Sequence, residues 1–370
     1  MILVSLLGEF DSSVLPVFFE FKHEITHHLL IHGIDDRSRQ SAVRITSGLN
    51  AVRAKFRLKC TLRETQVNAN DLKSIYALIN EIINMSPPDQ LMINASDASA
   101  SLVIVLSKEA LDAGAQLLVY DRYENTITKL TSNGMRKHNI KHNMKIEDHI
   151  ISKGYTLIEA RDVNDLYNRK AHIEQITENF DTFQRFRRRI MLEKNIERER
   201  YETVIEPLLK MGVLARNGKI LDMNYILGGL FEDIIYFLVA SLNFDDILSG
   251  VKVSYHTVDN VLVQNEFDVL MIKNNHLYII ECKFRDRVDG ENLIYKYDAL
   301  LDQMDHDGKV MIINVASTES KEAIKRGKRI HKNFEKGALL RAQLNNTLIY
   351  YEPTLDTDKL LSMMRGFFDL

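Results

Sequence analysis

The sequence has few cysteines, little net charge and no long apolar run, and each absence excludes a class of protein. Its two cysteines, Cys60 and Cys282, lie in strand-like segments without the spacing of metal ligands. They predict buried thiols in a reducing compartment, not a disulfide framework or a zinc site. The formal net charge is −3, so any contact with a nucleic acid must use local basic patches. No apolar run is long enough to span a membrane.

Two further absences concern targeting and nucleotide hydrolysis. The N-terminus begins with the strand-like residues 2–6 rather than with a basic region and a cleavage site, so we expect a cytoplasmic protein with no membrane partner. No loop contains the Gly-Lys-Ser or Gly-Lys-Thr of a P-loop, which disfavours nucleotide hydrolysis. With 370 residues, 45% of them hydrophobic and 27% charged, the chain is typical of a globular protein with two or three domains.

The most informative stretch is residues 265–283, which predict two strands joined by a tight turn. Asn274 and Asn275 separate two apolar segments, and asparagine tolerates the positive φ angles of a two-residue hairpin turn. Such a turn pairs Lys273 with His276. The pairing of every other residue in the hairpin follows from this register.

The register places charged side chains on one face of the hairpin. Asp268 lies opposite Glu281, and Glu266 lies opposite Lys283, because side chains alternate between faces along a strand. Two facing carboxylates destabilise a sheet, so a divalent cation between Asp268 and Glu281 is the simplest compensation. Carboxylate oxygens suit Mg²⁺ or Mn²⁺, and Lys283 would stand beside the ion to orient a water or stabilise a phosphate. The apolar residues expected to bury the opposite face are Phe267, Val269, Met271, Tyr278, Ile280 and Cys282.

A further acidic residue precedes the hairpin in an apolar helical segment. Residues 228–238 predict a helix that carries Glu232. A surface position for Glu232 and a merely structural Glu-x-Lys strand remain the alternative interpretation. In this order, Glu232, Asp268, Glu281 and Lys283 resemble the PD-(D/E)xK nuclease superfamily. The resemblance implies metal-dependent phosphodiester hydrolysis, with Asp268, Glu281 and Glu232 at the metal and Lys283 assisting the nucleophile, while Glu266 pairs with Lys283 or joins the metal shell.

Residues 1–155 alternate apolar strands with helical patterns, which predicts an open, mainly parallel α/β sheet. The predicted strands cover residues 2–6, 56–62, 91–94, 116–121 and 126–130. One predicted helix begins near residue 14, a second is capped by Asn70 or Asp71 and runs to about Met85, and a third ends near Ala113. Ligands of such sheets bind beyond the carboxyl ends of the strands. Two small polar loops lie there, although loops of this kind are often mere connections. Their candidate ligand contacts are Gly8, Glu9, Phe10, Asp11, Ser12, Ser13, Asn94, Ala95, Ser96, Asp97 and Ser99.

Residues 156–224 predict a charged helical connector that ends in a small hairpin at Asn217-Gly218. A basic cluster at Arg185 and residues 187–189 either contacts phosphates or forms a solvated helix face. The positions expected to be buried are Leu166, Ile173, Ile176, Phe180, Phe183 and Ile190.

Residues 225–370 predict a helix, three strands, a helix and a further strand, which is the order of the PD-(D/E)xK core. The strands are expected near residues 251–257, 261–273, 276–284 and 309–315, and the second helix near 291–304. A basic segment follows that either holds a nucleic-acid backbone or forms a charged, solvated helix. It contains Lys321, Lys325, Arg326, Lys328, Arg329, Lys332, Lys336 and Arg341.

The order of these parts resembles the CRISPR-ancillary effector nucleases, which carry an N-terminal CARF (CRISPR-associated Rossmann fold) sensor before a nuclease domain. The resemblance implies a homodimer that binds cyclic tetra-adenylate in one symmetric pocket and then cleaves DNA, RNA or both in type III CRISPR antiviral defence. Related proteins often carry a Gly-Gly-Thr-Lys-like loop where residues 95–99 stand here, without Gly or Lys.

Two other hypotheses stay open at this point. One is a restriction- or repair-type nuclease whose N-terminal domain binds nucleic acid or protein, without a second-messenger ligand. The other is a non-catalytic nucleotide sensor or scaffold. A thermal-shift screen with cyclic oligoadenylates and a metal-dependent cleavage assay separate the three hypotheses.

Overall fold

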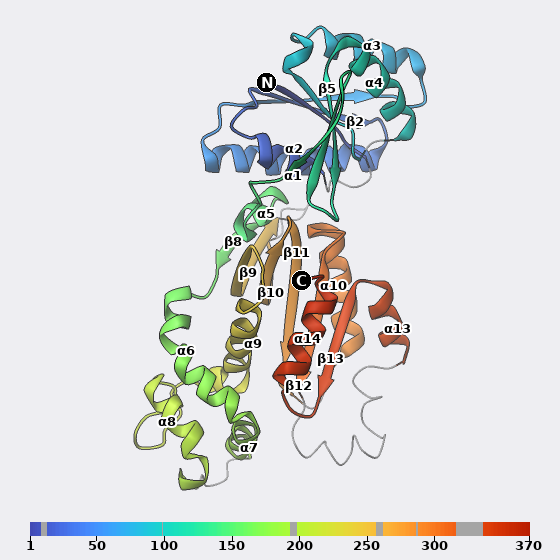
Figure 1. The fold of residues 1–370 in the computed structure, drawn as a ribbon. Coiled ribbons are helices and arrows are strands. Elements are labelled where there is room, and N and C mark those ends of the chain that lie inside the picture. Colours follow the sequence, from blue (N-terminus) through green and yellow to red (C-terminus); the bar gives the residue numbers. More distant parts are fainter. Residues whose placement is uncertain (9–12, 98, 193–197, 257–261, 286–287, 316–335) are drawn as a thin grey trace. The chain divides into compact units, whose positions relative to one another are not determined.

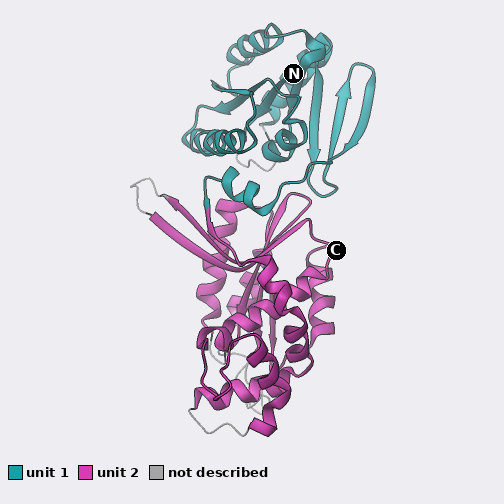
Figure 2. Ribbon diagram, turned by 90° about the vertical axis from the view of Figure 1, so that its left-hand side faces the viewer, with its two compact units in different colours: residues 1–156 teal, residues 157–370 magenta. Residues whose placement is uncertain are grey.

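The computed structural model describes the whole chain except residues 9–12, 98, 193–197, 257–261, 286–287 and 316–335. It divides into two compact units, residues 1–156 and 157–370, which Figure 2 shows in separate colours. The finer division of the chain at residues 155 and 224 stays a prediction. Within the described residues, no helix is both long and apolar enough to cross a membrane.

The N-terminal unit is built on a seven-stranded sheet in the order β3-β2-β1-β4-β5-β6-β7. Figure 1 shows this unit in blue to green. Strands β1 to β5 run parallel, and β6 and β7 continue the sheet as antiparallel strands. The prediction of an open, mainly parallel sheet is therefore confirmed. The strands are β1 (Ile2–Leu6), β2 (His27–Gly33), β3 (Thr61–Val67), β4 (Leu91–Asn94), β5 (Gln116–Asp121), β6 (Thr126–Thr131) and β7 (Gly134–Asn139).

Helices cover both faces of this sheet, because its central strands alternate apolar side chains between two cores. Leu3 packs in one core with residues of α1 and α2, and Val4 packs in the other with residues of α3 and α4. The predicted N-cap of α3 is confirmed, since the Asp71 carboxylate accepts a hydrogen bond from the Lys73 N–H at 3.0 Å. The helices are α1 (Val14–Phe21), α2 (Asp36–Phe56), α3 (Leu72–Ile83), a short 3₁₀ turn (Pro88–Gln90), α4 (Ala100–Ala113) and α5 (Ile146–Ser152).

The predicted strand over residues 56–62 is wrong. Phe56 ends α2, and Arg57 follows as its C-cap with φ 52° in the left-handed region. The strand, β3, begins only at Thr61. It lies at the edge of the sheet, and most of its side chains are exposed or half-buried, so no apolar alternation marks it in the sequence. Strand β2 and helix α2 are also new from the structure.

The C-terminal unit contains a six-stranded sheet in the order β13-β12-β11-β10-β9-β8. Strands β9, β10 and β11 form an antiparallel meander, and β11, β12 and β13 run parallel. The strands are β8 (Thr156–Glu159), β9 (Asp246–His256), β10 (Leu262–Lys273), β11 (His276–Lys283), β12 (Lys309–Val315) and β13 (Thr347–Glu352).

The helices of the predicted connector share one hydrophobic core with the sheet of the C-terminal unit. That core joins α6, α7 and α8 to α9, to α14 and to the central strands. All six connector positions expected to be buried are buried, so this prediction is confirmed. The helices are α6 (Val163–Glu178), α7 (Phe180–Met191), a 3₁₀ turn (Arg198–Tyr201), α8 (Glu202–Lys210), a π-helical turn (Tyr225–Gly229), α9 (Leu230–Ala240), α10 (Gly290–Met304), α13 (Lys336–Leu344) and α14 (Thr357–Phe367).

The structure describes part of each predicted basic surface, the connector cluster and the C-terminal segment. Arg187 of the connector cluster is buried, where its guanidinium lies 4.2 Å from the centre of the Phe284 ring and donates to the Phe284 carbonyl at 2.5 Å. It therefore supports the core and does not face a phosphate. Of the C-terminal basic segment, residues 321–332 lie outside the described part of the chain. Arg341 of α13 stacks over the Tyr295 ring at 4.1 Å.

Candidate functional site

The hairpin formed by β10 and β11 has the predicted register. Lys273 pairs with His276. Between them, Asn274 and Asn275 adopt φ angles of 53° and 67°, the positive values that a two-residue primed turn requires. This local agreement fixes which charged residues come together farther along the two strands.

Asp268 lies beside the carboxyl end of β11. Its carboxylate accepts a hydrogen bond from the backbone N–H of Cys282 at 2.6 Å. Burial and the charges of Glu281 and Glu232 raise the pKa of Asp268 well above its usual range, against the opposing effects of Lys283 and the Cys282 N–H. A nearby cation stabilises the ionised form of a carboxylate whose pKa is raised by neighbouring negative charges.

Glu281 is buried, and both of its carboxylate oxygens are held. Its Oε1 forms an ion pair with the Lys283 ammonium, and its Oε2 accepts a hydrogen bond from the Tyr297 hydroxyl. Tyr297 comes from α10 and is fully buried. Lys283 forms an ion pair with Glu281, whereas Glu266 lies opposite Lys252 of β9. The expected ion pair between Glu266 and Lys283 is therefore not found among the described residues, and a place for Glu266 in the metal shell stays a prediction.

Glu232 reaches the same region from the first turn of α9, where a guanidinium holds it. Arg161 forms ion pairs with Glu232 and with its neighbour Asp233. These three side chains and Glu266 line a cavity of about 450 Å³. No local sequence pattern marks Arg161, because its partners lie about seventy residues away.

The acidic residues fit a hard divalent cation. Among the described residues, no three His, Cys, Asp or Glu side chains already converge as a complete metal site. Magnesium ions do not need one, since proteins usually bind them through one or two carboxylates, with waters and substrate phosphates as the other ligands. Asp268 and Glu281 offer this donor set. The roles of Glu232, Asp268, Glu281 and Lys283 at a metal stay predictions.

The two candidate ligand loops of the N-terminal unit meet beyond the carboxyl ends of β1 and β4, which are adjacent parallel strands. The Ser13 backbone N–H donates to the Asp97 carboxylate at 2.9 Å, and the Asn94 side-chain amide donates to Ser13 Oγ at 3.1 Å. Ser96 Oγ donates to the Asn94 side-chain carbonyl at 2.7 Å. These side chains hold the loops together at a point where the strand order reverses, a position typical of ligand sites.

The remaining candidate contacts in these loops are less informative. Gly8 follows β1, the Ala95 N–H donates to the Leu118 carbonyl, and Ser99 precedes α4. Glu9, Phe10, Asp11 and Ser12 lie outside the described residues. As an anion, Asp97 is better suited to holding Ser13 than to contacting a phosphate. The ligand contacts of both loops stay predictions.

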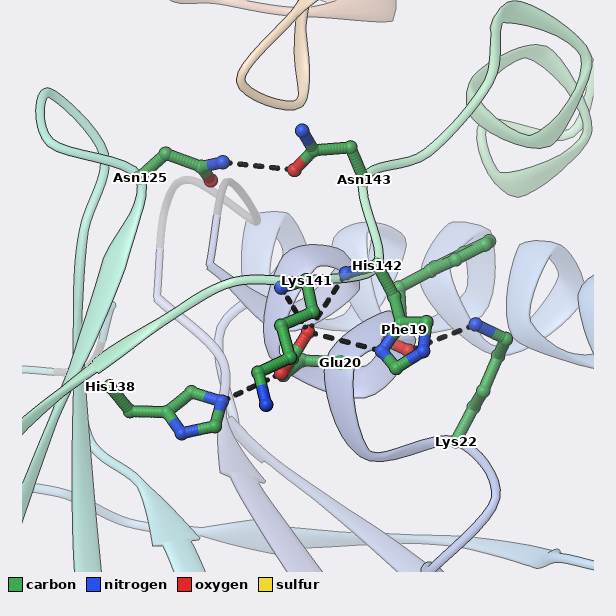
Figure 3. A network of polar contacts seen from close by, with 8 residues as sticks. All are labelled: Phe19, Glu20, Lys22, Asn125, His138, Lys141, His142 and Asn143. Atoms are coloured by element: carbon green, nitrogen blue, oxygen red, sulfur yellow. Dashed lines mark hydrogen bonds and ion pairs between the residues drawn. The ribbon is translucent and has the colours of Figure 1, made fainter. Parts of the chain in front are cut away.

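A second polar network ties α1 to the end of β7 and to the segment that follows it (Figure 3). Buried Glu20 accepts hydrogen bonds from His138 Nε2 at 2.6 Å and from the backbone N–H groups of Lys141 and His142 at 2.8 and 3.0 Å. Burial alone would raise the pKa of Glu20, but these hydrogen bonds together lower it. Because α1 begins directly after the first ligand loop, the network links that loop to the chain that leads to α5.

Comparisons with known proteins agree with this geometry. Residues 222–347 match the family model of the Card1-like endonuclease domain. A comparison with curated proteins found no match.

Solved structures resemble the chain over its whole length. Protein VC1899 from Vibrio cholerae has a TM-score of 0.72 and 15% identity, over 100% of this chain and 97% of that one. Can2 from Sulfobacillus thermosulfidooxidans, solved in complex with cyclic tetra-adenylate, has a TM-score of 0.68 and 15% identity, over 100% and 99%. Identities this low establish a shared fold only. Residues 222–347 are thus similar to a Card1-like endonuclease domain, and the chain as a whole shares the two-unit α/β fold of these solved structures.

Proposed function

We propose that this protein is a metal-dependent endonuclease that cyclic tetra-adenylate activates, and that it cleaves DNA, RNA or both in type III CRISPR antiviral defence. The observation that carries the proposal is the buried carboxylate pair Asp268 and Glu281, with the Lys283 ammonium beside it, inside a Card1-like endonuclease domain. The cytoplasm is the proposed location, which fits the buried, unpaired thiols of Cys60 and Cys282.

Each side chain of the candidate site has its own role in the proposed reaction. Asp268 and Glu281 would hold Mg²⁺ or Mn²⁺, which when bound supplies a Lewis acid for a phosphate oxygen and a source of activated water. Lys283, on the same strand as Glu281, orients the attacking water or stabilises charge on the phosphate. Tyr297 fixes one oxygen of Glu281, so that the carboxylate does not need to reorganise during the reaction. Glu232 assists through a water or a second cation.

Activation by a cyclic tetra-adenylate rests on the N-terminal unit. Can2, which shares the full-length fold, was solved with this ligand. In the present chain, the loops after β1 and β4 offer a place for such a ligand, beyond the carboxyl ends of parallel strands. A two-fold symmetric ligand fits a pocket between two copies of one loop pair, so we propose that the active protein is a homodimer.

A cleavage assay tests the catalytic part of the proposal. The wild type is incubated with single-stranded DNA, supercoiled DNA, single-stranded RNA and duplex RNA, with Mn²⁺ and with or without cyclic tetra-adenylate. We expect cleavage of at least one substrate that requires both additions, and its loss by about 10²-fold or more in Glu281→Ala and Lys283→Ala. The control is Glu291→Ala, because Glu291 is an exposed acid on α10.

The ligand part of the proposal is tested separately by thermal shift. At a concentration of one hundred times its Kd, a ligand that binds only the folded protein adds about 2.7 kcal/mol to the free energy of unfolding. We therefore expect cyclic tetra-adenylate to raise the melting temperature, and linear tetra-adenylate to raise it much less. Metal-dependent cleavage without any cyclic oligoadenylate effect would instead identify a nuclease without a second messenger.

A further inference from the structure

Arg161 lies near the start of the C-terminal unit. It follows β8, the first strand after the N-terminal unit, and precedes α6. Its backbone N–H donates to the Ser249 carbonyl of β9 at 2.9 Å. Gly250, with φ 57°, leaves room for the Arg161 side chain, since a Cβ at Gly250 would lie 2.9 Å from Arg161 Cγ and Nε. Both the main chain and the side chain of Arg161 are thus fixed by β9.

The guanidinium of Arg161 holds the start of α9 through three groups. One of its nitrogens donates to the Gly229 carbonyl at 3.2 Å and forms an ion pair with Asp233, and another forms an ion pair with Glu232. Asp233 is 1% exposed and also accepts a hydrogen bond from the Tyr225 hydroxyl at 2.7 Å. This is a guanidinium in contact with two adjacent carboxylates, a geometry that a lysine does not reproduce.

The two carboxylates have different surroundings, which separates two roles of Arg161. Asp233 points into the protein, and its charge needs a partner for the unit to fold. Glu232 is 21% exposed and lines the cavity next to Glu266 of β10. Asp268 lies two residues farther along the same strand, and side chains two residues apart on a strand share a face. The contact with Asp233 is structural, whereas the contact with Glu232 sets the direction of a carboxylate at the edge of the candidate active site.

We propose that Arg161 is a positioning residue of the nuclease site, which fixes the carboxylate of Glu232 toward the Asp268–Glu281 pair. The inference rests on the proposed function for the part that Glu232 plays in cleavage. The segment between β8 and α6 would thus contact Glu232, a side chain of the candidate site, directly. A shift of that segment relative to β9 would reorient Glu232.

The experiment separates positioning from folding by neutralising the buried charge first. Asp233→Asn keeps an acceptor for the Tyr225 hydroxyl and removes the charge that needs a guanidinium. We compare Arg161→Gln, Asp233→Asn and the double variant by melting temperature and by kcat and KM for the cleaved substrate. Arg161→Gln alone is expected to melt at a lower temperature than wild type, and the double variant to melt close to Asp233→Asn.

The kinetic result decides the proposal. We expect kcat of the double variant to be about 10- to 100-fold below that of Asp233→Asn, with KM changed little, because a misdirected group costs rate more than substrate binding. Equal kcat in the two proteins would overturn the proposal. Arg198→Gln is the matched control, since Arg198 is an exposed arginine of the same unit that pairs with exposed Glu206 at 3.6 Å, and it should retain the wild-type kcat.

A crystal structure of the double variant gives a readout that does not depend on activity. A Glu232 side chain turned away from its wild-type direction supports the proposal, and an unchanged direction overturns it. A wild type that shows no metal-dependent cleavage would refute the proposed function, and the position of Glu232 in the double variant would still decide what Arg161 does.

Discussion

Removing one hydroxyl from Tyr297 should weaken the nuclease site without emptying the core around it. In Tyr297→Phe the buried ring remains, but Glu281 Oε2 loses its donor. A hydrogen bond to a charged group contributes about 1.5–3 kcal/mol to the free energy of unfolding. For a unit of this size, each kcal/mol corresponds to about 2–4 °C. The melting temperature of the metal-free protein should therefore fall by roughly 3–12 °C.

The same substitution should also slow cleavage, because Tyr297 orients a carboxylate proposed to hold the metal. Residues that orient metal ligands typically contribute about 10- to 100-fold to metal affinity or activity. We expect Tyr297→Phe to need more Mn²⁺ for half-maximal cleavage and to cleave more slowly at saturating Mn²⁺. The assays are a thermal melt without metal and a Mn²⁺ titration of the cleavage rate.

Tyr295→Phe is the matched control, because Tyr295 lies on the same helix and is 45% exposed. It should change neither the melting temperature nor the Mn²⁺ requirement appreciably. If Tyr297→Phe and Tyr295→Phe behave alike in both assays, the phenol does not hold Glu281, and the reasoning from this contact fails.

Three further predictions concern the metal site, the Glu20 network and the hairpin turn. Asp268→Asn should raise the melting temperature of the metal-free protein, because it removes one of two repelling carboxylates, and it should abolish the stabilisation by Mn²⁺. Melts with and without Mn²⁺ measure both effects, and an unchanged stabilisation by Mn²⁺ would place the ion elsewhere. Glu20→Gln should destabilise the chain more at pH 7 than at pH 4: the folded pKa of Glu20 is lowered, so its contribution is present above its usual pKa and is lost as the pH falls through the lowered value. Melts across this pH range should show the two proteins converging at low pH, and a constant difference would count against the network. Asn274→Val should lower the free energy of unfolding by about 1–3 kcal/mol because of its positive φ, whereas Asn274→Gly should be nearly neutral in a denaturant titration.

The hairpin could be predicted closely because its information is local. Two asparagines in sequence specify a turn with positive φ angles, and the apolar segments on either side specify which residues face each other. The pairing of Lys273 with His276 then fixes the strands on which Asp268 and Glu281 lie. A short turn therefore determines much of the candidate site.

Other parts of the fold carried no such local signal. Strand β3 is polar because it lies at the edge of the sheet. Its backbone pairing with β2, rather than the burial of its side chains, holds it in the sheet. Helix α2 is mostly polar and was not recognised, although the Asp35 side chain caps it. These elements depend on the assembled sheet, which a residue pattern does not show.

The polar partners of the site were missed for a related reason. Arg161 contacts Glu232 and Asp233 only because β8 joins the edge of the nuclease sheet. Tyr297 contacts Glu281 only because α10 packs beside β11. The first contact joins residues about seventy positions apart, and the second joins a strand to the helix that follows it. Neither contact is marked by a local residue pattern, so the sequence predicted the acidic residues but not the groups that hold them.

The position of Mn²⁺ in a crystal of the metal-loaded protein, located by its anomalous scattering, directly tests whether Asp268 and Glu281 hold the ion. We expect a peak coordinated by carboxylate oxygens of both Asp268 and Glu281. A peak at another site, with these two carboxylates uncoordinated in protein that cleaves nucleic acid, would contradict it.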